Sequence, residues 1–132
     1  MNRNERYILF SGIIIAASLY AYQFMDQPIS LGDVSAEEAA RLIGTLNNLI
    51  ILDVRTREEY DIEHIQNAVL IPVQELENRV DELFKDETLL VYCRTGNRSQ
   101  TAVTILEEKG FTKIYHMNGG ITIWKSAGYP TV

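Results

Sequence analysis

The stretch from Tyr92 to Ser99 contains residues whose types and spacing could support nucleophilic chemistry. It includes Cys93, the only cysteine of the chain, at the end of an apolar run. Glycine and asparagine follow it, and both tolerate the backbone angles of a tight loop. If Ser99 caps a helix, the loop amides surround an anion at the helix N-terminus. The candidate site therefore combines a nucleophile with anion-binding residues, which are Arg94, Thr95, Gly96, Asn97, Arg98 and Ser99.

These surroundings favour the ionised form of the cysteine. Loop amides, the positive end of a helix and the side chains of Arg94 and Arg98 would all stabilise negative charge on the sulfur. The pKa of the Cys93 thiol is therefore expected to lie below its reference value of about 8.5. The alternative is an inert cysteine packed as a small apolar residue, which leaves the two arginines and the flexible loop unexplained.

The length of the loop bears on what the thiolate attacks. Four residues separate Cys93 from Arg98, one fewer than in the loops of cysteine phosphatases. The shorter loop suits an object smaller than a tetrahedral phosphate, such as a single sulfur atom attached to the cysteine.

Strand and helix patterns alternate around this loop. Such alternation predicts an α/β domain with a mostly parallel sheet and helices on both faces. Continuous apolar runs predict buried strands, and the expected strands lie within 28–32 and over 49–54, 68–71, 88–92 and 113–117. Helices are expected over 35–44, 74–84, 99–109 and 120–126, with a short helix or turn over 57–61.

Two charged residues at the end of the strand over 49–54 are expected to support the site. Asp53 would accept hydrogen bonds from loop amides, and Arg55 would pair with Glu58 or Glu59.

The composition is that of an ordinary globular protein. The chain has 132 residues, 46% hydrophobic and 23% charged, which suits one domain. Its net charge is −6 without a lysine and arginine cluster, so nothing favours nucleic-acid binding. One cysteine and two histidines do not indicate a metal site, and no cofactor is expected. The oligomeric state stays open.

The first 26 residues differ from the rest. No charged residue occurs from Tyr7 to Met25, and these 19 residues would span about 28 Å as a helix, close to the thickness of a bilayer core. Because arginines precede this segment, the N-terminus is expected in the cytoplasm. We therefore expect a signal anchor over 1–26, with a membrane helix over 7–25, and an extracytoplasmic domain over 27–132. The alternatives are a cleaved signal peptide, which would leave a secreted or periplasmic domain, and a core helix or disordered extension.

Four motifs in order resemble those of single-domain rhodaneses, the thiosulfate sulfurtransferases. The resemblance covers nearly all of residues 33–132 and implies a rhodanese-like domain. Glu63 and Asn67 stand where the family usually has glycine. The motifs are L-D-V-R at 52–55 with E-E-Y at 58–60, H-I-Q-N-A-V-L-I-P at 64–72, Y-C-R-T-G-N-R-S at 92–99 and N-G-G-I-T-I-W-K-S-A-G-Y-P at 118–130.

The resemblance implies a sulfurtransferase with a persulfide intermediate. The Cys93 thiolate would take the sulfane sulfur of a small anionic donor such as thiosulfate and pass it to cyanide or a thiol. Because the nucleophile is already ionised, no general base is required, and His64 and His116 are interpreted as structural. The alternatives are a non-enzymatic rhodanese-like module that binds a partner, and a cysteine phosphatase or arsenate reductase on the same fold.

Overall fold

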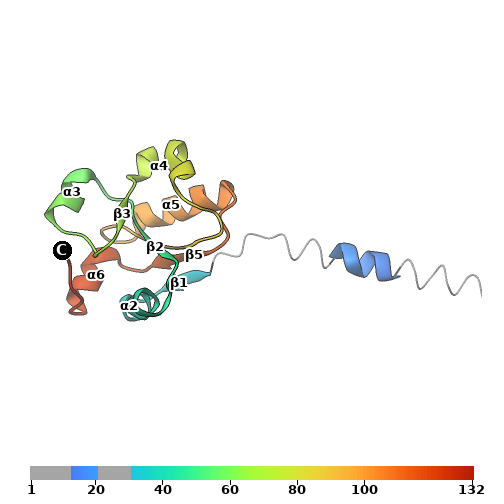
Figure 1. Ribbon diagram of the computed structural model, residues 1–132, viewed down its shortest axis with the longest axis horizontal. Helices are drawn as coiled ribbons and strands as arrows, with labels where there is room; N and C mark the ends of the chain where they lie inside the picture. Colours follow the sequence, from blue (N-terminus) through green and yellow to red (C-terminus); the bar gives the residue numbers. More distant parts are fainter. Residues whose placement is uncertain (1–12, 21–30) are drawn as a thin grey trace, which may run out of the picture.

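The computed structural model describes residues 13–20 and 31–132, and the larger part contains a parallel sheet (Figure 1). The strand order is β1-β5-β4-β2-β3, and all neighbouring strands are parallel. The expected α/β class with a parallel sheet is therefore confirmed. The strands are β1 (Gly32–Val34), β2 (Leu49–Asp53), β3 (Val69–Leu70), β4 (Thr88–Tyr92) and β5 (Ile114–Met117).

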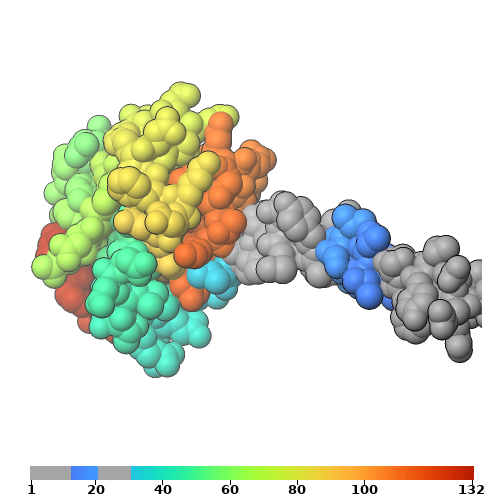
Figure 2. Space-filling model, turned by 45° about the vertical axis from the view of Figure 1, so that its right-hand side comes forward, coloured from blue at the N-terminus to red at the C-terminus, as the bar shows by residue number. Residues whose placement is uncertain are grey.

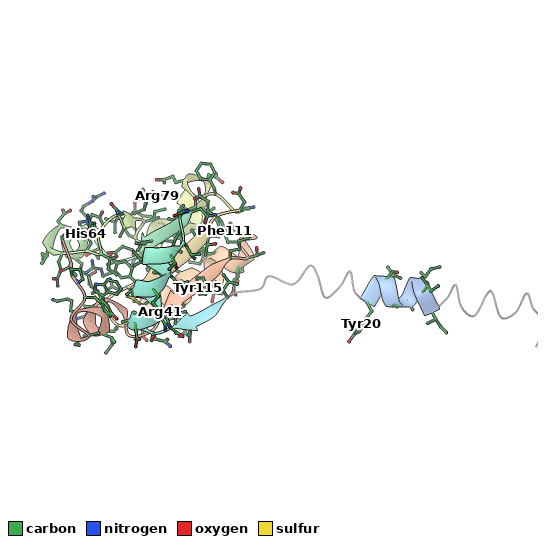
Figure 3. The ribbon with its side chains drawn as sticks, turned by 60° about the horizontal axis from the view of Figure 1, so that its bottom comes forward. Tyr20, Arg41, His64, Arg79, Phe111 and Tyr115 are labelled. Carbon is green, nitrogen blue, oxygen red and sulfur yellow. The ribbon has the colours of Figure 1, made fainter. Side chains whose placement is uncertain are left out.

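Helices cover both faces of this sheet. Figure 1 shows α4 and α5 on one face and α2 and α6 on the other. Arg41 on α2 and Arg79 on α4 lie on opposite sides of the sheet in Figure 3, and Figure 2 shows the segments of α2 and α4 at the bottom and the top of the folded part. The helices are α2 (Ala36–Thr45), α3 (Arg57–Ile62), α4 (Val73–Arg79) with the 3-10 turn η1 (Val80–Glu82), α5 (Asn97–Glu108) and α6 (Gly120–Ser126).

The central strand β4 divides its side chains between two hydrophobic cores. Leu89 and Val91 pack in the core under α4 and α5, whereas Leu90 and Tyr92 pack in the core under α2 and α6. Full burial of a leucine contributes roughly 1.5–3 kcal/mol, so this alternation fixes the strand firmly. Cys93 continues the pattern and lies in the core that α5 covers.

Capping boxes define the starts of two helices. Before α2, the Glu38 amide donates to Ser35 Oγ at 3.1 Å and the Ser35 amide donates to Glu38 Oε2 at 3.0 Å. Thr56 and Glu59 make the same reciprocal pair before α3. Each box satisfies amides that have no partner inside the helix.

Several element boundaries differ from those expected, and two of these differences have a clear structural reason. The first strand was expected within 28–32, but β1 begins at Gly32, and residues 28–30 lie outside the described part. The register of β1 explains this shift, because it pairs with β5 through Val34, which is buried. The helix expected over 74–84 is also shorter, since α4 ends at Arg79 and a 3-10 turn follows. Leu83 then adopts an extended conformation, which buries its side chain in the core.

The expected membrane segment lies partly outside the described residues. Residues 13–20 are helical, and Ile13, Ile14 and Ile15 are exposed there. Within 13–20 and 31–132, no helix has both the length and the apolar character needed to cross a bilayer.

A glycine pair joins β5 to α6. Gly120 has a φ of +59°, and a Cβ added there would lie 2.3 Å from the Cys93 carbonyl oxygen. The next amide, of Ile121, donates to that same oxygen at 2.9 Å. The N-terminus of α6 is therefore in direct contact with the backbone at the end of β4, and no larger residue fits there.

Gly120→Ala is expected to lower the free energy of unfolding by about 2 kcal/mol or more. A left-handed backbone costs a residue with a Cβ roughly 1–2 kcal/mol, and the contact with backbone atoms adds to this cost. The matched control is Gly44→Ala, because Gly44 is helical with open space around it. That change should stabilise the protein by up to about 1 kcal/mol. Urea unfolding of both variants checks this prediction, and similar effects of the two would contradict it.

Candidate active site

The loop that carries the cysteine joins β4 to α5. Cys93 directly follows β4, and its side chain is buried. We call residues 93–99 the cysteine loop. Gly96 adopts a φ of +113° before the first helical residue, Asn97. The helix therefore begins two residues before the expected start at Ser99, and the Ser99 hydroxyl does not cap it.

The thiol of Cys93 lies among hydrogen-bond donors. The Gly96 amide donates to Sγ at 3.1 Å, and Ser99 Oγ lies 3.3 Å from Sγ. Burial opposes ionisation, but hydrogen bonds from the Ser99 hydroxyl and the amides of Ser99, Gly96 and Thr95 outweigh it and lower the pKa of Cys93. The direction is the expected one. Hydrogen bonds are the main cause of the lowered pKa of Cys93. The prediction from the sequence had also counted the charges of the two arginines.

Arg98 is held by a carboxylate of α3. Its Nη1 and Nη2 donate to Glu59 at 2.6 and 2.8 Å, which makes a bidentate ion pair. The Arg98 contact and the capping bonds from Thr56 hold the pKa of Glu59 at about 2. Arg98 therefore fastens the cysteine loop to α3, and in this geometry its guanidinium faces a carboxylate.

Arg94 differs from Arg98 in its surroundings. Its side chain is exposed and borders a cavity of about 420 Å³ beside the cysteine loop. Cys93 is not among the residues that line this cavity. The lining consists of apolar walls, hydroxyl groups and charged side chains, from Arg55, Glu59, Ile62, Glu63, Arg94, Ile121, Thr122, Lys125 and Ser126.

Asp53 and Arg55 form a buried ion pair behind the site. Arg55 Nη2 donates to Asp53 Oδ2 at 2.7 Å, and the Arg55 amide donates to Oδ1 at 2.9 Å. The expected pairing of Arg55 with Glu58 or Glu59 is therefore wrong. The carboxylate of Asp53 also accepts from the Tyr92 hydroxyl at 2.6 Å. Burial and the Asp53 charge raise the pKa of Tyr92, so this phenol stays protonated and locks the end of β4 to β2.

His64 joins the segment after α3 to the C-terminal residues of the chain. Its ring stacks on Tyr60, and its backbone exchanges two hydrogen bonds with Val132. Figure 3 shows His64 beside the C-terminal segment. These contacts agree with the structural interpretation of this histidine.

His116 has a different position, which the sequence did not reveal. Its Nε2 lies 2.7 Å from Ser99 Oγ, and its Nδ1 lies 2.9 Å from Asp33 Oδ1. A continuous hydrogen-bonded chain therefore runs from Asp33 through His116 and Ser99 to Cys93. The only local signal was a polar ring in an otherwise apolar strand, and nothing near His116 in the sequence points to Ser99.

No cluster suited to a metal ion occurs in the part of the chain that the structure describes. Three or more His, Cys, Asp or Glu side chains do not gather anywhere within it.

Comparison with known proteins adds to this geometry. The model of the rhodanese-like domain family matches residues 35–127. YrkF of Bacillus subtilis is 34% identical over 95 residues, which are 72% of this chain and 51% of YrkF, so the chain spans about half of that relative. Thiosulfate sulfurtransferase GlpE of Coxiella burnetii is 37% identical over 84 residues, covering 64% of this chain and 78% of GlpE. The crystal structure of a rhodanese-related protein from Thermoplasma volcanium has a TM-score of 0.70 at 34% identity, covering 76% of this chain and 96% of that one.

The contacts of Glu59 predict an acid-dependent contribution to stability. Its folded pKa of about 2 lies below the unfolded value of about 4.3. The stabilisation is therefore complete above the unfolded pKa and is lost as the pH falls towards 2. Glu59→Gln should lower the free energy of unfolding clearly at pH 7 and less at pH 3. Glu58→Gln, on the same helix but exposed, is the matched control.

Urea unfolding of both variants and the wild-type protein at the two pH values measures this difference. An equal loss at pH 7 and pH 3 for Glu59→Gln would contradict the assignment.

Proposed function

The chain belongs to the rhodanese-like domain family, and from that premise we propose that it is a sulfurtransferase that carries sulfur on Cys93. The observation that carries this proposal is the environment of the thiol. A buried cysteine with a lowered pKa lies against loop amides and the Ser99 hydroxyl. A thiolate is the form that attacks sulfur, and donors around it can also hold an anionic persulfide.

The first half-reaction loads the sulfur. The Cys93 thiolate attacks the outer sulfur of thiosulfate, a new S–S bond forms, and the original S–S bond breaks. The electron pair of the broken bond leaves on sulfite. Three negative charges enter and three leave, so no proton and no outside oxidant is required. The amides of the cysteine loop would receive the charge of the persulfide.

The second half-reaction unloads the sulfur. A nucleophilic acceptor, cyanide or a thiolate, attacks the outer sulfur of the persulfide. The S–S bond to Cys93 breaks, and its electron pair returns to Sγ. The hydrogen bonds that lower the pKa of Cys93 make this sulfur a better leaving group. One set of contacts therefore assists both halves of the cycle.

The two arginines have separate roles in this proposal. Arg94 is exposed at the rim of the adjacent cavity, where its charge can attract the oxygens of thiosulfate. Arg98, bound to Glu59, maintains the shape of the loop. The bond to Glu59 and the short spacing from Cys93 also disfavour a phosphatase, in which the arginine must be available to phosphate.

Cys93→Ser is expected to abolish sulfur transfer while the protein stays folded. A serine hydroxyl is neutral at pH 7 and forms no persulfide. The measurement is thiocyanate formation from thiosulfate and cyanide, combined with mass spectrometry of the intact chain. Wild-type protein treated with thiosulfate should gain about 32 Da, the mass of one sulfur atom.

Arg94→Ala is the matched variant for this experiment because it keeps the thiol and removes an exposed charge. It should still form the persulfide, but with a higher KM for thiosulfate. Transfer by Cys93→Ser at the wild-type rate would overturn the proposal. A wild-type chain that gains no sulfur from thiosulfate or another sulfane donor would favour the non-enzymatic module instead.

We also propose that the segment over 7–25 anchors the domain on the extracytoplasmic face of a membrane. The support is its length without charge and the arginines before it. Ile14→Lys places a charge near its middle, at a cost of roughly 2.5–3.5 kcal/mol on insertion scales. This variant should lose membrane association, whereas Ile14→Leu should keep it.

Protease treatment of intact cells or spheroplasts, followed by fractionation, tests the topology. Digestion of the domain without lysis is expected. Resistance until lysis would contradict the topology, and a chain that begins near Leu19 or Tyr22 would replace the anchor with a cleaved signal peptide.

A further inference from the structure

We propose that His116 takes the proton of the Cys93 thiol through the Ser99 hydroxyl, with Asp33 fixing the orientation of the imidazole. This inference rests on the proposed function, because it explains how the sulfur-carrying thiolate arises. In this proposal Ser99 contacts the reacting sulfur. His116 and Asp33 are positioning residues that act on the sulfur only through Ser99.

The chain of contacts determines which ring nitrogen carries a proton. Asp33 Oδ1 lies 2.9 Å from His116 Nδ1, and a carboxylate can only accept a hydrogen bond. Nδ1 therefore carries a proton. In the neutral ring Nε2 is then unprotonated and accepts from the Ser99 hydroxyl at 2.7 Å.

The Ser99 hydroxyl can transmit a proton because it donates and accepts at once. Two acceptors lie within reach of its proton, the Gly96 carbonyl oxygen at 3.0 Å and the closer Nε2 at 2.7 Å. With the proton directed at Nε2, the lone pairs of Oγ face the Cys93 thiol at 3.3 Å. The thiol proton moves to Oγ while the hydroxyl proton moves to Nε2. One S–H bond and one O–H bond break, and one O–H bond and one N–H bond form. A neutral thiol and a neutral imidazole become a thiolate and an imidazolium, and nothing is oxidised or reduced.

The products have matching hydrogen bonds. The new Nε2–H donates to Ser99 Oγ, and the remaining hydroxyl proton donates to the thiolate. The imidazolium keeps its Nδ1–H bond to Asp33. The thiolate and the imidazolium therefore both have partners, which buried charges require, and the side chain of Asp33 is 55% exposed.

Burial strengthens the coupling between the two ends of this chain. Ser99 is 0% exposed and His116 5%, so the charges of the thiolate and imidazolium interact with little screening by water. Asp33 lies opposite His116 in the pairing of β1 with β5, which holds the carboxylate at the ring. On the other elements packed here, Arg98 of α5 lies near the sulfur and is paired with Glu59 of α3.

Alkylation of the single cysteine by iodoacetamide provides the first test. Its rate follows the fraction of thiolate and needs no sulfur donor, so the result is independent of the proposed function. At pH 6.5, Asp33→Asn should react about threefold to tenfold more slowly than wild type, and Ser99→Ala more slowly still, because one pKa unit is a tenfold change. All rates should converge near pH 9.5. Asp81→Asn, an exposed site on η1, is the matched control and should equal wild type.

Nitrogen NMR of the imidazole rings separates proton transfer from a purely structural contact. The chain has two histidines, so His64→Gln assigns both signals. In the wild-type chain the transferred proton should be seen on Nε2 of His116. In Cys93→Ala, Nε2 should lose its proton, because no thiol supplies one and no thiolate stabilises the imidazolium.

The same protonation of His116 in both proteins would overturn the proposal, as would equal alkylation rates for Asp33→Asn and Asp81→Asn at pH 6.5. If both results are as expected but no sulfane donor loads the wild-type chain, the relay holds and the proposed sulfur transfer fails.

Discussion

The site depends on lowering the pKa of a thiol that is almost fully buried. Burial alone would drive Cys93 to its neutral form, so the fold must direct donors at the sulfur. The strand β4 delivers the side chain into the core, and the start of α5 returns the amide of Gly96 and the hydroxyl of Ser99 to it. The remaining contacts at this edge of the sheet hold these two segments in place.

Three supports act on this loop from different directions. The N-terminus of α6 donates amides to the carbonyls of Cys93 and Arg94 from one side. Glu59 of α3 binds Arg98 from another, and β5 presents His116 to Ser99. Each support comes from the carboxyl end of a strand or from the segment that follows one, where sites form in open α/β sheets. The parallel sheet therefore positions a site that no single segment could build.

Features with local causes were predictable from the sequence. The capping box of Ser35, the helix over 120–126 and the cysteine loop itself all follow from residues close together in the chain. Two contacts that the sequence did not reveal join distant segments: Arg98 and Glu59 are 39 residues apart, and Ser99 and His116 are 17 apart. Arg55 was assigned to a nearby glutamate, whereas a buried carboxylate at its own strand end competes better. Local pattern identifies such residues as polar but cannot tell which partner the packing will supply.

The burial of Cys93 also affects which sulfur atom of a persulfide an acceptor can attack. A persulfide offers two sulfur atoms to an incoming thiolate, and attack at the inner one would leave the protein joined to its acceptor as a mixed disulfide. Cys93 is 1% exposed, whereas the outer sulfur of a persulfide extends a further bond length of about 2 Å from Sγ. Because the inner sulfur is buried, the proposed cycle favours attack at the outer atom. In the proposed cycle, this burial would direct the acceptor to the atom that is released and return Cys93 as a free thiolate.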